Sequence, residues 1–301
     1  MIDYIVPLFK DANIYFIQGQ RKGRVPYSNS VVLGDYLIDT GVSATRLKKI
    51  KRTFQIKKLL FSHWHDDHIR ECNIFSDIPF YCHPEAKPII EDIEKLLDLY
   101  EIRNTPAEPQ FKLYLSDIID AYGIKIEGTF EHNDIITIGD DIQVKILYAP
   151  GHSIGHCIFH IPELKFAFLG DIDLSKFGPW YGGTDSDVIE FIDSIDKVLK
   201  MDLETVVTGH SGLYKGKKLI RHELEKYKSI FTRREEMIKG FLSEAKPRNP
   251  EDLLEKNIIY KRYDFLKPFL LAMEKTMIQK HFDKLLVENK IAKKNDGFIL
   301  K

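Results

Sequence analysis

The stretch LLFSHWHDDH, residues 59–68, decides how the rest of the chain is interpreted, because three apolar residues lead directly into a histidine cluster. Four side chains of this cluster, those of His63, His65, Asp67 and His68, can bind a metal ion. Imidazole and carboxylate groups suit zinc and related divalent ions, and the tight spacing lets one loop offer ligands to two metal centres. Core packing does not explain such a cluster, and the alternative is a solvated polar loop. We therefore expect a metal site at the end of a buried strand.

Further apolar runs along the chain also end in a residue that can bind metal. In three of them a glycine directly precedes this residue, which allows close approach of the backbone. The glycine precedes His152 in APGH (149–152), Asp171 in FLGD (168–171) and His210 in VVTGH (206–210). The fourth residue is Asp39 in LIDTG (37–41). The repetition of one arrangement at several strand ends indicates that the side chains meet at one edge of a sheet.

Taken in order, these five motifs resemble those of the metallo-β-lactamase superfamily of hydrolases, over most of residues 1–215. The resemblance implies an α/β fold, an αββα sandwich with the metal site at the edge where the strand ends meet. It also implies two metal ions with seven protein ligands. One ion would be held by His63, His65 and His152, the second by Asp67, His68 and His210, and Asp171 would bridge the two.

The same resemblance places Asp39 behind the ligands, where it would orient a ligand histidine as outer carboxylates do. Asp67 and Asp39 are therefore the candidate catalytic carboxylates. Two ions about 3.5–4 Å apart can share a hydroxide, lower its pKa towards neutrality and stabilise the oxyanion that forms on attack. Zinc is the first expectation, and iron or manganese are alternatives. The family often has Gly-Gly after the motif, whereas this chain has Ile69–Cys72, so the shape of that loop is open.

The segment FGPWYGG, residues 177–183, mixes aromatic side chains with glycines shortly after Asp171. We expect Phe177, Trp180 and Tyr181 to line the substrate pocket, with Tyr181 as a candidate proton donor to a leaving group. Ordinary core packing of these rings is the alternative. His156 lies near the site in sequence, but strand alternation favours a packed or hydrogen-bonded histidine over a metal ligand.

Local periodicity predicts several elements around these motifs. We expect helices over 84–103 and 115–122, a strand over 124–126, and a helix over 185–200 that is capped by Asp185 or Ser186. The region 84–123 is a candidate lid or homodimer contact.

The C-terminal part differs in character and charge. Residues 1–214 contain 22 Lys and Arg against 32 Asp and Glu, whereas residues 215–301 contain 22 against 13. We predict a hydrolase domain over 1–215 and a helical C-terminal region over 216–301. From about residue 250, a helix near 276–290 followed by a hairpin at 291–300 looks like a winged helix. The basic excess makes RNA a candidate partner, although a dense stripe of arginine and aromatic residues is missing and a solvated helical surface explains the charge equally well.

Composition narrows the class of protein. A chain of 301 residues with 44% hydrophobic and 30% charged residues is ordinary for a globular protein with a real core. The sequence contains no apolar run of the roughly 20 residues that cross a bilayer, so we expect no membrane association. The N-terminus lacks a basic segment followed by an apolar one, and we expect a cytoplasmic protein. Cys72, Cys82 and Cys157 are then reduced, buried thiols.

Several functions fit this set of residues. The first is hydrolysis of an ester or thioester in a small molecule, as in the glyoxalase-II-like members that the core resembles. The second is endonuclease action on single-stranded RNA, as in a lactamase-like branch with a C-terminal module. The third is a mononuclear iron enzyme with a persulfide or oxygen substrate. A non-enzymatic nucleic-acid-binding protein is disfavoured by the intact ligand set.

Overall fold

The computed structural model describes residues 3–263 and 266–301 and contains two mixed β-sheets packed face to face. The first sheet has seven strands in the order of the chain: its first four are antiparallel neighbours, and from the fourth onwards they are parallel. Its strands are β1 (Ile5–Phe9), β2 (Ile14–Ile17), β3 (Ser30–Leu33), β4 (Tyr36–Ile38), β5 (Lys58–Leu60), β6 (Phe80–Cys82) and β7 (Gly128–Thr129).

The second sheet has six strands in the order β13-β12-β11-β10-β9-β8, antiparallel except for the parallel pair β11–β12. Its strands are β8 (Ile135–Ile138), β9 (Ile142–Tyr148), β10 (Cys157–Ile161), β11 (Phe166–Phe168), β12 (Thr205–Thr208) and β13 (Gly212–Lys215). All residues of β11 and β12 are buried, and their apolar Phe166–Phe168 and Val206–Val207 are expected for strands covered on both faces.

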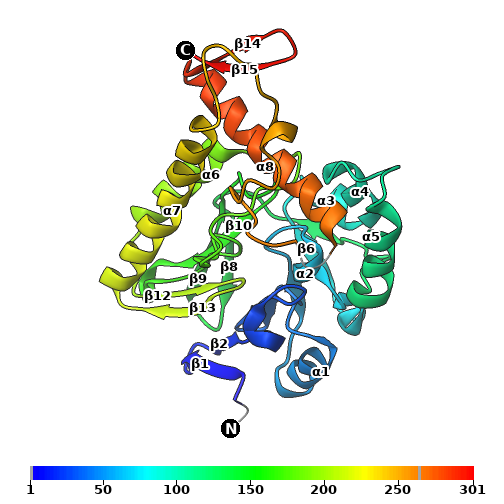
Figure 1. The fold of residues 1–301 in the computed structure, drawn as a ribbon. Helices are drawn as coiled ribbons and strands as arrows, with labels where there is room; N and C mark the ends of the chain where they lie inside the picture. The colour runs from blue at the N-terminus through cyan, green and yellow to red at the C-terminus, as the bar shows by residue number, and fades with distance from the viewer. Residues whose placement is uncertain (1–2, 264–265) are drawn as a thin grey trace.

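Helices cover the outer faces of both sheets (Figure 1). On the side of the first sheet these are α1 (Ala44–Thr53), α2 (Asp66–Ile69), α3 (Lys87–Ile90), α4 (Leu96–Leu99) and α5 (Glu108–Tyr114). On the side of the second sheet lie α6 (Val188–Leu199) and α7 (Lys217–Lys239). Buried apolar side chains form three clusters, one between the sheets and one between each sheet and its helices. This layering confirms the predicted αββα sandwich.

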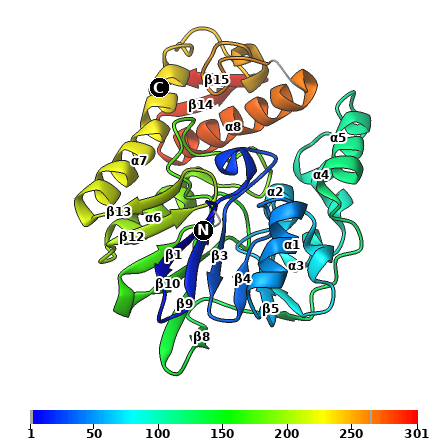
Figure 2. The same cartoon turned by 90° about the horizontal axis from the view of Figure 1, so that it is seen from below.

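The C-terminal region follows α7 with a single 3-10 turn (Pro250–Leu253), helix α8 (Lys267–Val287) and the hairpin β14–β15 (Ile291–Lys294 and Gly297–Leu300). The expected helix and hairpin are thus present, while the winged-helix assignment and the domain boundary at 215 stay predictions. Helix α8 lies across the end of the sandwich, with α7 on one side and α4–α5 on the other (Figure 2). Its Met277, Ile278 and Phe282 share one apolar cluster with Ala167 and Val206 of the second sheet.

Three local predictions are corrected. The expected helix over 84–103 is three short turns, α3, Ile93–Lys95 and α4, interrupted at Asp92, whose backbone leaves the helical region. The helix expected over 115–122 is only a π turn at Leu115–Ile119 that continues α5, and the expected strand 124–126 is absent from this described stretch, where the short β7 follows at Gly128–Thr129. Apolar spacing alone did not reveal these breaks, because the interrupted turns still bury one face. No described helix combines the length and apolar character that crossing a bilayer requires.

Candidate metal centre

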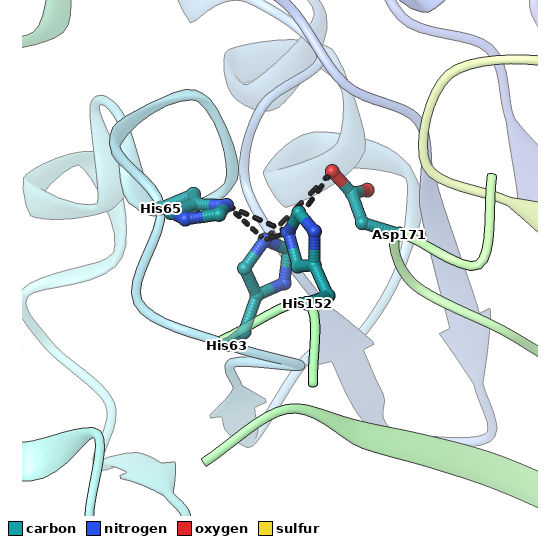
Figure 3. Close-up of side chains that lie close together, drawn as sticks. All are labelled: His63, His65, His152 and Asp171. Atoms are coloured by element: carbon teal, nitrogen blue, oxygen red, sulfur yellow. Dashed lines mark hydrogen bonds and ion pairs between the residues drawn. The ribbon is translucent and has the colours of Figure 1, made fainter. Parts of the chain in front are cut away.

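Three histidine ring nitrogens converge with one carboxylate at the edge of the sandwich (Figure 3). Nδ1 of His65 lies 3.0 Å from Nε2 of His63 and 2.8 Å from Nε2 of His152. Oδ2 of Asp171 lies 3.5 Å from the His152 nitrogen and 3.9 Å from the His63 nitrogen. His63 follows β5, His152 follows β9 and Asp171 follows β11, so two sheets contribute to one group.

A second group of side chains lies next to the first and is reached by both oxygens of the same carboxylate. It contains Asp67, His68 and His210. Nε2 of His210 lies 3.3 Å from Oδ2 of Asp67 and 3.2 Å from Oδ2 of Asp171. Oδ1 of Asp171 lies 3.0 Å from Nε2 of His68. The structure therefore brings together all seven side chains that the sequence suggested as metal ligands, with Asp171 between the two groups.

The polar atoms at the centre of these groups fit a bound cation. Asp67 Oδ2, His68 Nε2 and Asp171 Oδ1 are buried and have no hydrogen-bond partner among the described residues. Buried polar atoms without partners are rare in folded proteins because each costs the free energy of its lost hydration. The donor set is nitrogen and carboxylate oxygen, which is the chemistry that zinc, iron and manganese accept.

Hydrogen bonds behind the ligands fix the ring tautomers. The Nδ1 atoms of four histidines each have an oxygen partner, so that in the neutral ring the proton lies on Nδ1 and Nε2 can bind a metal. These contacts are His63 with Ser62 Oγ (2.9 Å), His68 with Asp39 Oδ2 (2.7 Å), His152 with the Trp180 carbonyl (2.9 Å) and His210 with the Gly23 carbonyl (2.6 Å). His65 is the exception, since its Nδ1 faces the group and its buried Nε2 has no described partner.

Asp39 lies behind the second group, as the resemblance implied, and does not face the converging ligand atoms. Its Oδ1 accepts a hydrogen bond from the Ser62 backbone N–H, and its Oδ2 accepts from the Ser62 hydroxyl and from His68, all at 2.7 Å. The residue is fully buried and adopts a left-handed backbone conformation with φ of 61°. One carboxylate thereby orients His68 directly and His63 through Ser62.

The two groups differ in their electrostatics. Burial and the neighbouring histidines hold the pKa of His63 and of His65 well below the usual value, and burial lowers the pKa of His152 to about 3. Neutral imidazoles are the form that binds metal. Burial also opposes charge on His210, but the carboxylates of Asp171 and Asp67 outweigh it and raise its pKa to about 10. The second group thus attracts positive charge strongly.

Two glycines before the ligands are required by close approach. A Cβ atom on Gly209 would lie 2.3 Å from Oδ1 of Asp171, and one on Gly170 would lie 2.6 Å from Nε2 of His156. Gly170 also has a φ of 53°, which favours glycine. His156 is buried and accepts a hydrogen bond from the Asp171 backbone N–H at 3.0 Å, so its expected packing role is confirmed.

The predicted pocket residues lie in three different surroundings. The Trp180 ring is half-buried, 5.1 Å from the His65 ring and nearly perpendicular to it, so it borders the first group. Phe177 is exposed and lies beside Tyr260, 5.4 Å away. Tyr181 corrects the prediction: it is fully buried, and its hydroxyl lies 2.7 Å from Nε2 of His281. It is a core residue and not a proton donor at the metal groups.

Two residues behind the ligand loops were assigned the wrong role by the sequence. Asp185 does not cap α6: its Oδ2 accepts hydrogen bonds from Trp64 Nε1 (3.1 Å) and from the Ile154 backbone N–H (2.9 Å), which ties two ligand loops together. Ser186 donates to the His152 carbonyl at 2.8 Å. The cap is Asp187, whose side chain accepts from the N–H of Glu190 at 2.9 Å. The spacing of Asp187 to Glu190 carried that signal.

Comparison with known proteins agrees with this architecture. The family model described as the metallo-β-lactamase superfamily matches residues 23–210. In solved structures, a β-lactamase domain protein from Burkholderia ambifaria superposes with a TM-score of 0.74 at 15% identity, covering 99% of this chain and 93% of that one. At this identity the likeness concerns the fold.

Several curated relatives carry the names of enzymes, and two of them align over more than 130 residues. A hydroxyacylglutathione hydrolase from Erythrobacter litoralis is 27% identical over 138 residues, 41% of this chain and 53% of the relative. An atrochrysone carboxyl ACP thioesterase from Aspergillus fumigatus is 22% identical over 197 residues, 62% of this chain and 51% of the relative. The chain thus spans about half the length of each.

Proposed function

Because the chain belongs to the metallo-β-lactamase superfamily, whose members are hydrolases, we propose that it is a binuclear metal-dependent hydrolase of ester or thioester bonds in a small molecule. The single observation that carries the proposal is the Asp171 carboxylate, which lies 3.0–3.9 Å from ring nitrogens of both groups: Oδ2 faces both groups and Oδ1 faces His68. A carboxylate in this position suits a bridging ligand between two ions.

The seven side chains of the two groups would bind two metal ions. His63, His65 and His152 would hold one ion, Asp67, His68 and His210 the other, and Asp171 both. When bound, two divalent ions supply an activated water and positive charge for the oxyanion that develops on the attacked carbonyl. The protein itself keeps the three imidazoles of the first group neutral by burial. It orients His63, His68, His152 and His210 through their Nδ1 partners and excludes bulk water by burying the ligands.

The proposal of an ester or thioester substrate rests on the two named relatives and on the surroundings of the site. One relative is named as a hydrolase of hydroxyacylglutathione, which is a thioester, and the other is named as an ACP thioesterase. The Trp180 ring beside His65 offers an apolar wall to an acyl group. Zinc is the metal that we propose first, on the nitrogen-rich donor set.

An RNA substrate is less well supported, because much of the C-terminal basic charge is engaged. Lys217 pairs with Asp202 and Lys228 with Asp196 at 2.6 Å. Lys284 and Lys290 pair with acidic residues of the C-terminal region itself. Cations held by carboxylates contribute less to a phosphate-binding surface than free ones. Metal analysis distinguishes the mononuclear iron alternative from the proposal, because one iron per chain supports the first and two zinc ions oppose it.

The test is an assay of one metal-loaded preparation on several substrates. Metal content is first measured by plasma mass spectrometry, and thiol release from lactoylglutathione and from an acyl-CoA is then followed with a thiol reagent. Asp67→Asn is the inactivating variant, and Asp296→Asn, in the exposed turn of the β14–β15 hairpin, is the matched control. The proposal expects two zinc ions per chain and thiol release by the wild type and the control alone.

Other outcomes of this assay would contradict the proposal. Cleavage of end-labelled single-stranded RNA without thioester or ester hydrolysis would make the protein a nuclease. One iron per chain with oxygen consumption would support the mononuclear iron alternative.

A further inference from the structure

A buried arginine of α7 holds the segment that carries Trp180. The side chain of Arg234 is 2% exposed and reaches from the C-terminal region to the loop after Asp171. Its guanidinium donates hydrogen bonds to the carbonyl oxygens of Pro179 and Phe177, the latter at 2.9 Å. It also donates to the Tyr181 hydroxyl at 3.1 Å.

The surroundings of this guanidinium are unusual for a buried cation. Arg234 makes no ion pair within the described residues, and its charge faces backbone carbonyls and two aromatic rings instead. The guanidinium carbon lies 5.0 Å from the centre of the Phe177 ring and 5.5 Å from that of Tyr181. Burial of a charge without a carboxylate costs free energy. Its planar fork, which grips two carbonyls at once, is a property that lysine lacks.

The segment 177–181, which Arg234 holds, contacts a proposed metal ligand. Trp180 lies between Pro179 and Tyr181, both of which accept hydrogen bonds from Arg234. The carbonyl oxygen of Trp180 is 2.9 Å from Nδ1 of His152. The Trp180 indole N–H donates to the Tyr260 hydroxyl at 3.0 Å, so a second part of the C-terminal region holds the same residue. The carbonyl that sets the tautomer of His152 is therefore held in place from both sides.

We propose that Arg234 is a positioning residue for the first metal group, acting through the Trp180 carbonyl on His152 and through the Trp180 ring on His65. This inference rests on the proposed function only in so far as those histidines hold a metal. It assigns to α7 a part in completing the metal centre. The loss of Arg234 should weaken the first metal group selectively, because the contacts of Asp67, His68 and His210 described above do not include residues 177–181.

The test measures metal binding without substrate, so it is independent of which bond the enzyme cleaves. Arg234→Met removes the guanidinium and keeps much of the side-chain volume. Arg233→Met is the matched control, because Arg233 is the exposed neighbour on the same helix. We expect Arg234→Met to bind one of the two metal ions about 10–100-fold more weakly, the range found for partners behind metal ligands. The control should bind both as the wild type does.

Two further measurements separate positioning from folding. Circular dichroism and thermal unfolding establish that each variant is folded, and the visible spectrum of the Co²⁺-loaded protein reports the geometry of the metal ligands. If Arg234→Met does not fold, Arg234→Lys takes its place, since it keeps the charge but cannot grip both carbonyls. A folded Arg234 variant with wild-type affinity for both ions and an unchanged Co²⁺ spectrum would overturn the proposal.

If the wild type itself binds no metal, the proposed function fails with it. If the wild type binds both metal ions and a folded Arg234 variant binds them equally well, only the positioning role is refuted.

Discussion

Replacement of Asp39 by asparagine tests how far one buried carboxylate controls the second metal group. Its two oxygens accept three hydrogen bonds, two from Ser62 and one from His68. Asparagine has the same shape and tolerates the left-handed backbone at this position, where φ is 61°. The substitution therefore changes hydrogen-bonding capacity while leaving the backbone unstrained.

The size of the effect follows from the contact that is lost. If the amide oxygen keeps the bond to the Ser62 N–H, the amide NH₂ group faces Nδ1–H of His68, and two donors oppose each other. Relief of this conflict moves the His68 proton to Nε2, the atom that the second ion needs. A hydrogen bond to a charged group contributes about 1.5–3 kcal/mol, and each 1.4 kcal/mol is tenfold in affinity. The second ion should bind about 10–100-fold more weakly.

The assay is competition with a zinc chelator, with Asp35→Asn as control because Asp35 is a partly exposed residue on the same hairpin. The first ion should be affected less, since Asp39 reaches His63 only through Ser62. A folded Asp39→Asn protein that holds both ions as tightly as the control would refute the view that this carboxylate orients His68.

Three more outcomes follow from the site and its surroundings. Removal of metal by a chelator should abolish hydrolysis and lower the melting temperature by about 5 °C or more, since an ion present at a hundred times its Kd stabilises by about 2.7 kcal/mol; an unchanged melting temperature would contradict it. Trp180→Ala should lower kcat/KM about tenfold if the ring borders the substrate, and unchanged kcat/KM would exclude that role. Burial, with the charges of Arg234 and Lys284, lowers the pKa of His281 to about 3. His281 protonates near pH 6.5 only when unfolded, so stability present above that pH should fall by about 2 kcal/mol on acidification to pH 5. Urea unfolding of metal-free wild type and His281→Gln at both pH values isolates this loss, and equal pH dependence would refute it.

The convergence of the seven proposed metal ligands was predictable from the sequence because each lies in the segment that follows a strand. Strand ends that share a sheet edge bring such residues together whatever the loops between them do. His63 to His68 come from one short segment, the loop after β5 and the start of α2, and the glycines before Asp171 and His210 mark close backbone approach. Among the residues behind the proposed ligands only Asp39 was predictable, because it belongs to the motif LIDTG.

The residues that hold the ligand loops escaped prediction because their partners are far away in the chain. Asp185 is 121 residues from Trp64, Tyr181 is 100 residues from His281, and Arg234 is 55 residues from Pro179. Such pairs leave no local periodicity. Tyr181 was placed at the site because it lies in the aromatic segment after Asp171, yet its hydroxyl is buried against His281 and Arg234, far away in the chain.

The charge asymmetry between the two parts of the chain has a structural explanation in this arrangement. The acidic residues Asp196 and Asp202 of the first part accept Lys228 and Lys217 of α7, at an exposed boundary where each pair contributes about 0–1 kcal/mol. Deeper in the same boundary, Arg234 contacts no carboxylate among the described residues and grips the backbone beside a proposed metal ligand. A basic helix packed against an acidic body thus needs no nucleic acid to account for its charge. Arg233→Met and Arg234→Met, which remove the same charge from adjacent positions, distinguish a helix that merely balances charge from one that completes the metal centre.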